Sequence, residues 1–229
     1  MIVLGLDTST KIGSVCVVRD GELLAEARGE SQKHGSEFLP MVDDVCRRAG
    51  VTPRDIDAVA IGAGPGSFTG LRIGMATAKG IAFAGKRPLW AVSSLAALGY
   101  EIGVLASEAA PIACVLDARR SEVFVGVYRA AGDRVVALAD ERVMAPREVG
   151  PYIAELAPGA RYAGDARTVY SELSDLEWTT AITPSAFAVA RLSLASDRID
   201  VLTSGVPAYL RRAEAEIMYP DGVPGALRR

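Results

Sequence analysis

The chain has 229 residues, of which half are apolar, a formal net charge of −3 and three cysteines. This length can bury a core as one domain or as two small ones, and the slight acidity argues against a strongly basic nucleic-acid-binding surface. The cysteines show no C-x-x-C spacing, which argues against a zinc knuckle or a redox pair, and no charge-free apolar run is long enough for a membrane span.

The first hundred residues predict three strands and then a helix, a strand and a second helix. Strands are expected at 2–6, 13–18 and 22–28, with a hairpin turn at Asp20-Gly21. Because residues 1–7 lack a basic region and a cleavage site, they indicate a first strand rather than a leader, and we expect a cytoplasmic protein. Apolar residues at helical spacing predict a helix that Ser36 caps and Gly50 ends. A strand at 57–61 then leads into a glycine-rich turn and a helix over 70–84.

The second half repeats this order of elements. Strands are expected at 112–116, 122–128 and 134–138, a helix at 146–156, a strand at 160–163 and a last helix at 186–195. Asp7 and Asp117 hold the same place in the two halves. We therefore predict an α/β fold of two similar β-β-β-α-β-α lobes, residues 1–105 and 106–216, with 217–229 as a disordered tail. The alternative is one irregular α/β domain whose halves resemble each other by accident.

The most unusual segment is the glycine-rich stretch 62–74. Its glycines permit positive φ and close backbone approach, so a phosphate, a substrate or a protein is expected very near it. Gly70, Gly74, Ala78 and Ala82 fall four residues apart and place a strip of tiny side chains on one helix face. Such a strip favours close packing of another helix, either from this chain or from a partner.

Two further features bear on chemistry. The turn Asp7-Thr8-Ser9-Thr10 can cradle a phosphate through its amides and hydroxyls, but Asp and Ser are equally at home in a plain turn. The single histidine, His34, lies in a polar stretch and is interpreted as a solvated loop residue, so a two-histidine metal site is not expected. No catalytic constellation is visible.

The Asp7–Thr10 turn, the run 64–74 and the late Pro207-Ala208-Tyr209-Leu210-Arg211 together resemble the TsaB (YeaZ) family. The resemblance implies an actin/Hsp70/sugar-kinase-like fold and a non-catalytic role in making threonylcarbamoyladenosine in tRNA. It implies the catalytic subunit TsaD and the ATPase TsaE as partners, a homodimer when the chain is alone, and only indirect contact with tRNA. It implies no cofactor of the chain's own, with ATP or ADP only at the junction with TsaD.

The same resemblance suggests that the metal-binding site of TsaD is absent from this chain. Ser94 and Leu98 stand where TsaD carries two metal-binding histidines, so neither a metal site nor transfer chemistry is expected. The expected partner surface comprises Leu39, Val42, Cys46, Gly70, Leu71, Gly74, Met75 and Ala78. The alternative is an enzyme of the same fold, either a nucleotide-binding phosphotransferase that uses Asp7 or a metallopeptidase-like protein.

Overall fold

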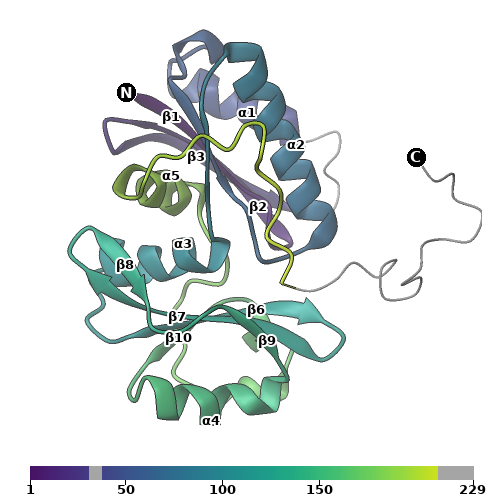
Figure 1. Ribbon diagram of the computed structural model, residues 1–229, viewed down its shortest axis with the longest axis vertical. Coiled ribbons are helices and arrows are strands. Elements are labelled where there is room, and N and C mark those ends of the chain that lie inside the picture. Colours follow the sequence, from purple (N-terminus) through teal and green to yellow (C-terminus); the bar gives the residue numbers. More distant parts are fainter. Residues whose placement is uncertain (31–37, 211–229) are drawn as a thin grey trace, which may run out of the picture.

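Two β-sheets organise the chain in a computed structural model that describes residues 1–30 and 38–210 (Figure 1). The first sheet has the strand order β3-β2-β1-β4-β5. Its strands are β1 (Ile2–Asp7), β2 (Ile12–Arg19), β3 (Glu22–Glu30), β4 (Ala58–Gly62) and β5 (Leu89–Val92). β1 runs antiparallel to β2 and parallel to β4. The β2–β3 hairpin turns at Asp20 and Gly21, whose φ angles of 51° and 89° are those that a tight primed turn needs.

The second sheet repeats this strand order. Its strand order is β10-β6-β7-β8. Read in reverse, as β8-β7-β6-β10, it matches β3-β2-β1-β4 of the first sheet strand for strand. β9 also pairs with β7. The strands are β6 (Ile112–Arg119), β7 (Glu122–Ala131), β8 (Arg134–Ala137), β9 (Arg142–Met144) and β10 (Arg161–Ala163). The duplicated order predicted from the sequence is therefore present in the topology. The short β9 was not predicted.

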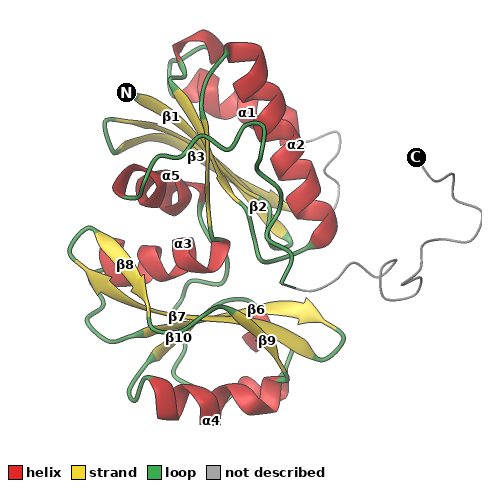
Figure 2. Cartoon of the chain, in the orientation of Figure 1, coloured by secondary structure: helices red, strands yellow, loops and turns green. Residues whose placement is uncertain are grey.

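Helices separate and cover the two sheets (Figure 2). They are α1 (Phe38–Arg48), α2 (Phe68–Gly85), α3 (Ser94–Tyr100), α4 (Pro146–Leu156) and α5 (Ala186–Ala195), with a π-helical turn at Glu101–Leu105 after α3. Short 3₁₀ turns lie at Pro53–Asp55, Ala166–Thr168 and Ser171–Leu173. α1 and α2 pack on one face of the first sheet and α5 on the other, while α4 covers the outer face of the second sheet. α3 lies between α5 and the second sheet.

The chain crosses back to the first sheet at its end. α5 packs on β1, β2 and β4, and the amide of Ala186 at its start donates to Ser14 Oγ over 2.8 Å. A Cβ added to Gly5 would press on the Ala186 carbonyl, so glycine is required where the helix approaches β1. The helix predicted for the second lobe thus lies on the first sheet, and the lobe boundary at 105/106 stays a prediction.

Some expectations fall on residues outside this description. They are Ser36 as a helix cap, His34 as a loop residue and 217–229 as a tail. Gly50 ends α1 with φ of 66°, as predicted. Within the described part of the chain, no helix has the length and apolar character to cross a membrane.

Candidate functional site

Asp7 ends β1 inside the protein, with no exposed surface. Its Oδ1 accepts the amide of Ser9 at 2.9 Å and the Ser9 hydroxyl at 2.7 Å, and its Oδ2 accepts the Ser94 hydroxyl at 2.7 Å. Burial raises the pKa of Asp7 from 3.8 to about 6, because these hydrogen bonds oppose the desolvation of the carboxylate without cancelling it. The carboxyl group is therefore a fixed member of an internal network.

The glycine-rich turn closes over this network. The amide of Gly64 donates to Ser94 Oγ at 3.2 Å, and the amide of Ser94 donates to the Gly64 carbonyl at 2.8 Å. A Cβ on Gly62 would overlap the Asp7 carboxylate, so only glycine fits at that point. The Gly64–Pro65 peptide bond is cis.

The start of α2 covers the rest of the Asp7–Thr10 turn. The Ser67 amide donates to the Ser9 carbonyl at 2.7 Å, and the Thr8 hydroxyl donates to the Gly70 carbonyl at 2.8 Å. Cβ atoms added to Gly66, Gly70 or Gly74 would overlap Ser9 or Thr8. The close neighbour that these glycines accommodate is thus the chain's own turn.

The structure places most of the predicted partner surface inside the chain. Gly70, Leu71, Gly74, Met75 and Ala78 lie on the buried face of α2, and Val42 and Cys46 are buried on α1. Of the eight predicted residues only Leu39 is open, with 57% of its surface exposed. Seven of them form part of the core in this structure, because the small residues that favour a close helix contact found their partner within the same chain. The predicted phosphate loop, Asp7, Thr8, Ser9 and Thr10, is likewise buried.

The opposite face of α2 is open. Thr69, Arg72, Ala76, Gly80 and Phe83 are all exposed, and at 100° per residue they fall on one side of the helix. Phe83 exposes 77% of its surface, and a Cβ added to Gly80 would meet nothing within 4 Å. The sequence carries this signal, since Ala76 and Gly80 are small residues on the face of α2 opposite the strip of Gly70 and Gly74.

The second sheet carries a related cluster of acids. Asp117 accepts the Tyr170 hydroxyl at 2.8 Å and lies 3.4 Å from Arg119, while its amide donates to Asp165 at 2.9 Å. Burial raises the pKa of Asp165 to about 6, opposed by the hydrogen bond from the Asp117 amide; the charge of Asp117 raises this pKa, and Lys11 from the first sheet's turn lowers it. Lys11, in the turn after β1, is therefore close enough to affect the carboxyl group of Asp165, which follows β10.

Comparison with known proteins places these features in a family. The family model described as "TsaD: tRNA N6-adenosine threonylcarbamoyltransferase" matches residues 28–172. The tRNA threonylcarbamoyladenosine biosynthesis protein TsaB of Escherichia coli is 36% identical over 129 residues, which cover 56% of this chain and 55% of that protein. YeaZ from Pseudomonas aeruginosa superimposes with a TM-score of 0.78 at 30% identity, over 91% of this chain and 99% of that one. The chain belongs to the TsaB (YeaZ) family.

The extent of these matches differs. The chain spans about half the length of the E. coli TsaB that it matches, whereas it aligns with nearly the whole of YeaZ. The activator of 2-hydroxyisocaproyl-CoA dehydratase from Clostridium difficile shares the fold alone, with a TM-score of 0.52 at 9% identity. Together with the duplicated sheets, these neighbours confirm the predicted actin/Hsp70/sugar-kinase-like fold.

Within this TsaB-family fold, the two residues predicted to replace metal ligands are both buried. Ser94 bonds to Asp7, and Leu98 packs among apolar side chains of the second sheet, including Ile112 and Leu116. Over residues 1–30 and 38–210, no group of three or more His, Cys, Asp or Glu side chains is arranged to hold a metal ion.

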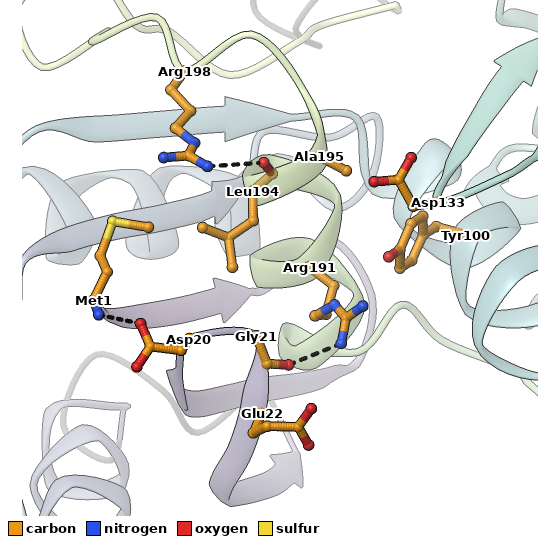
Figure 3. Close-up of a pocket in the computed structure, with 10 residues that line it drawn as sticks. All are labelled: Met1, Asp20, Gly21, Glu22, Tyr100, Asp133, Arg191, Leu194, Ala195 and Arg198. Atoms are coloured by element: carbon orange, nitrogen blue, oxygen red, sulfur yellow. Dashed lines mark hydrogen bonds and ion pairs between the residues drawn. The ribbon is translucent and has the colours of Figure 1, made fainter.

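A hollow of about 450 Å³ is lined in part by Arg191, Leu194 and Ala195 of α5 (Figure 3). This helix packs on the face of the first sheet opposite α1 and α2. The charged residues of the hollow have both signs, and each arginine donates to a backbone carbonyl. Arg191 bonds to Gly21 at 2.9 Å and Arg198 to Leu194 at 3.3 Å. The hollow is thus apart from both the Asp7 network and the open face of α2.

Proposed function

We propose that this chain is a non-catalytic subunit in the biosynthesis of tRNA threonylcarbamoyladenosine and that it binds a TsaD catalytic subunit. Family membership supports the pathway, because the E. coli relative is named as a biosynthesis protein of this modification. The match of residues 28–172 to the TsaD family model supports a common origin of this chain and the catalytic subunit. A paralogue that shares its partner's fold can use equivalent surfaces in a pseudo-symmetric contact.

The observation that carries the proposal is the open face of α2. Gly80 stands in the helix interior, where glycine costs about 1 kcal/mol relative to alanine, and no atom of the described chain needs the space it leaves. Beside it, Phe83 is a large apolar side chain left in solvent. Small residues flanked by an exposed aromatic ring suit the close approach of a helix from another protein. Leu39 on α1 adds a second exposed apolar side chain on the same side of the sheet.

The non-catalytic part of the proposal rests on Asp7 and Ser94. Both side chains are buried and bonded to each other. A phosphotransferase that used Asp7 would need this closed turn to open. The proposal has further parts. TsaE is a second partner, the chain alone forms a homodimer through the same face, and contact with tRNA is indirect. A nucleotide binds only at the junction with TsaD, and the protein is cytoplasmic.

The test compares two alanine-to-arginine substitutions with the same chemistry. Ala76 is exposed on α2, and Ala154 is exposed on α4 of the second sheet. We expect Ala76→Arg to weaken binding to purified TsaD and to reduce tRNA modification in a reconstituted reaction, and Ala154→Arg to leave both unchanged. The proposal fails if the wild-type chain does not bind TsaD, or if modification proceeds equally well without the chain.

A further inference from the structure

Arg72 is held in one orientation near the start of α2. The centre of its guanidinium lies 3.8 Å from the centroid of the Phe68 ring, and its Nε donates to the Tyr209 hydroxyl at 3.2 Å. The Tyr209 ring packs on Phe68 with 5.0 Å between centroids. Stacking and one hydrogen bond thus fix a side chain that is otherwise long and flexible.

Tyr209 reaches this position because the end of the described chain forms a strap, residues 199–210. Figure 1 follows this segment, in yellow, from α5 back across the first sheet. The Val201 amide donates to the Leu89 carbonyl at 2.8 Å, and the Ala208 amide donates to the Ala63 carbonyl at 2.7 Å. The strap is therefore tied to β5 and to the glycine-rich turn. The strap leaves apolar side chains in solvent along its length, with Val206 72% and Leu210 40% exposed.

The charge of Arg72 has no counterion in the described chain. α2 contains no acidic residue, and none of the ion pairs found over residues 1–30 and 38–210 involves Arg72. A guanidinium has five N–H donors, and within the described residues Arg72 uses only the one on Nε in a hydrogen bond. The two terminal nitrogens are thus oriented and available for a planar acceptor such as a carboxylate.

We propose that Arg72 binds a carboxylate of the TsaD partner and that Tyr209, with the strap, positions it. The inference rests on the proposed function, whose surface it extends. Arg72 lies on the same face of α2 as Gly80, about 12 Å along the helix axis at 1.5 Å per residue. An oriented arginine that stacks on a phenylalanine and bonds to a tyrosine has the composition of an interface hot spot. Because contacts within the chain already fix the Arg72 side chain, binding a partner costs it less conformational entropy.

An arginine stacked on an aromatic ring also suits an RNA base or phosphate. The protein partner is favoured because the open face of α2 that carries Arg72 also carries Ala76, Gly80 and the exposed Phe83, and because the chain has a net charge of −3. Direct binding of tRNA through Arg72 is therefore an outcome that would overturn the inference.

The experiment measures TsaD binding rates as a function of salt for Arg72→Ala, Arg72→Gln and Tyr209→Phe, with Arg147→Ala as the control. Arg147 is exposed on α4. We expect both Arg72 variants to weaken binding at least about ten-fold and to reduce the salt dependence of the association rate, because a steering charge is lost. Tyr209→Phe keeps the ring but not the hydroxyl. It should weaken binding about two- to five-fold, chiefly through faster dissociation, and should have no effect in an Arg72→Ala background.

The outcomes separate this inference from the proposed function. If Ala76→Arg weakens TsaD binding but neither Arg72 variant does, the inference is wrong and the proposed function stands. If the wild-type chain does not bind TsaD, the proposed function fails first. An additive effect of Tyr209→Phe and Arg72→Ala shows that Tyr209 does not act through Arg72. Arg72 variants that lose affinity for tRNA while binding TsaD normally would assign the site to RNA.

Discussion

The hydroxyl of Ser94 donates to the carboxylate of Asp7 over 2.7 Å and so joins the start of α3 to the end of β1. The same hydroxyl accepts the Gly64 amide. One buried oxygen therefore ties together β1, the glycine-rich turn and α3, which are far apart in the sequence. The position where the family resemblance places a metal ligand in TsaD is here a structural link.

Replacing Ser94 by alanine removes this link. We expect Ser94→Ala to lower the free energy of unfolding by about 1–3 kcal/mol, because a buried carboxylate loses a donor and a buried amide loses its acceptor. Urea denaturation measures the change. Ser193→Ala is the matched control, since Ser193 is equally buried but bonds only to the Ala190 carbonyl within α5. Equal losses in the two variants would contradict the special role of Ser94.

The raised pKa of Asp7 predicts how stability depends on pH. Below pH 3.8 the carboxyl group is protonated in both states. Between pH 3.8 and about 6 the folded state keeps the proton that the unfolded state has released, so this group's stabilising contribution is lost as pH rises through that window. Two pKa units correspond to about 3 kcal/mol. Urea midpoints at pH 4 and pH 7 should therefore differ less in Asp7→Asn than in the wild type.

Asp165 has a similarly raised pKa and supplies the control for this titration. Its contribution is the same in the wild type and in Asp7→Asn, so it cancels when the two pH profiles are subtracted. A difference profile that is flat between pH 4 and pH 7 would show that Asp7 keeps an ordinary pKa in the folded protein.

A second carboxylate joins the two sheets. Glu141, just before β9, accepts the Tyr128 hydroxyl at 2.5 Å and also the hydroxyl of Ser93, the residue that caps α3. We expect Tyr128→Phe and Ser93→Ala each to destabilise the fold by about 1 kcal/mol, with a coupling between them because they share one acceptor. A double-mutant cycle in urea measures the coupling. Strict additivity would mean that the two hydroxyls act independently.

Much of the fold was predictable because it rests on local rules. Alternating apolar runs and the turn residues Asp20-Gly21 located the hairpins, and the recurrence of that order revealed the second sheet. The return of α5 to the first sheet was not predictable, since its apolar residues would suit either sheet. What decides the choice is a contact between Ala186 and both Gly5 and Ser14, each more than 170 residues away in the sequence.

The site was predicted less well for a related reason. The sequence shows that Gly70 and Gly74 need space, but not which neighbour fills it. Asp7 and Ser94 are 87 residues apart in the sequence, and their hydrogen bond depends on the start of α3 meeting the end of β1. Arg72 and Tyr209 lay within the motifs of the resemblance, and only the path of the strap brings them together.

The two glycines of α2 that face opposite ways provide the last prediction. A Cβ at Gly74 would overlap the Thr8 hydroxyl, whereas one at Gly80 would meet nothing within 4 Å. Gly74→Ala should therefore destabilise the fold by about 1–3 kcal/mol through overpacking, and Gly80→Ala should stabilise it by about 0.5–1 kcal/mol through helix propensity. Thermal or urea unfolding of the isolated chain measures both. If Gly74→Ala left stability unchanged and weakened only the binding of TsaD, the face of α2 that the structure buries would be the partner surface after all.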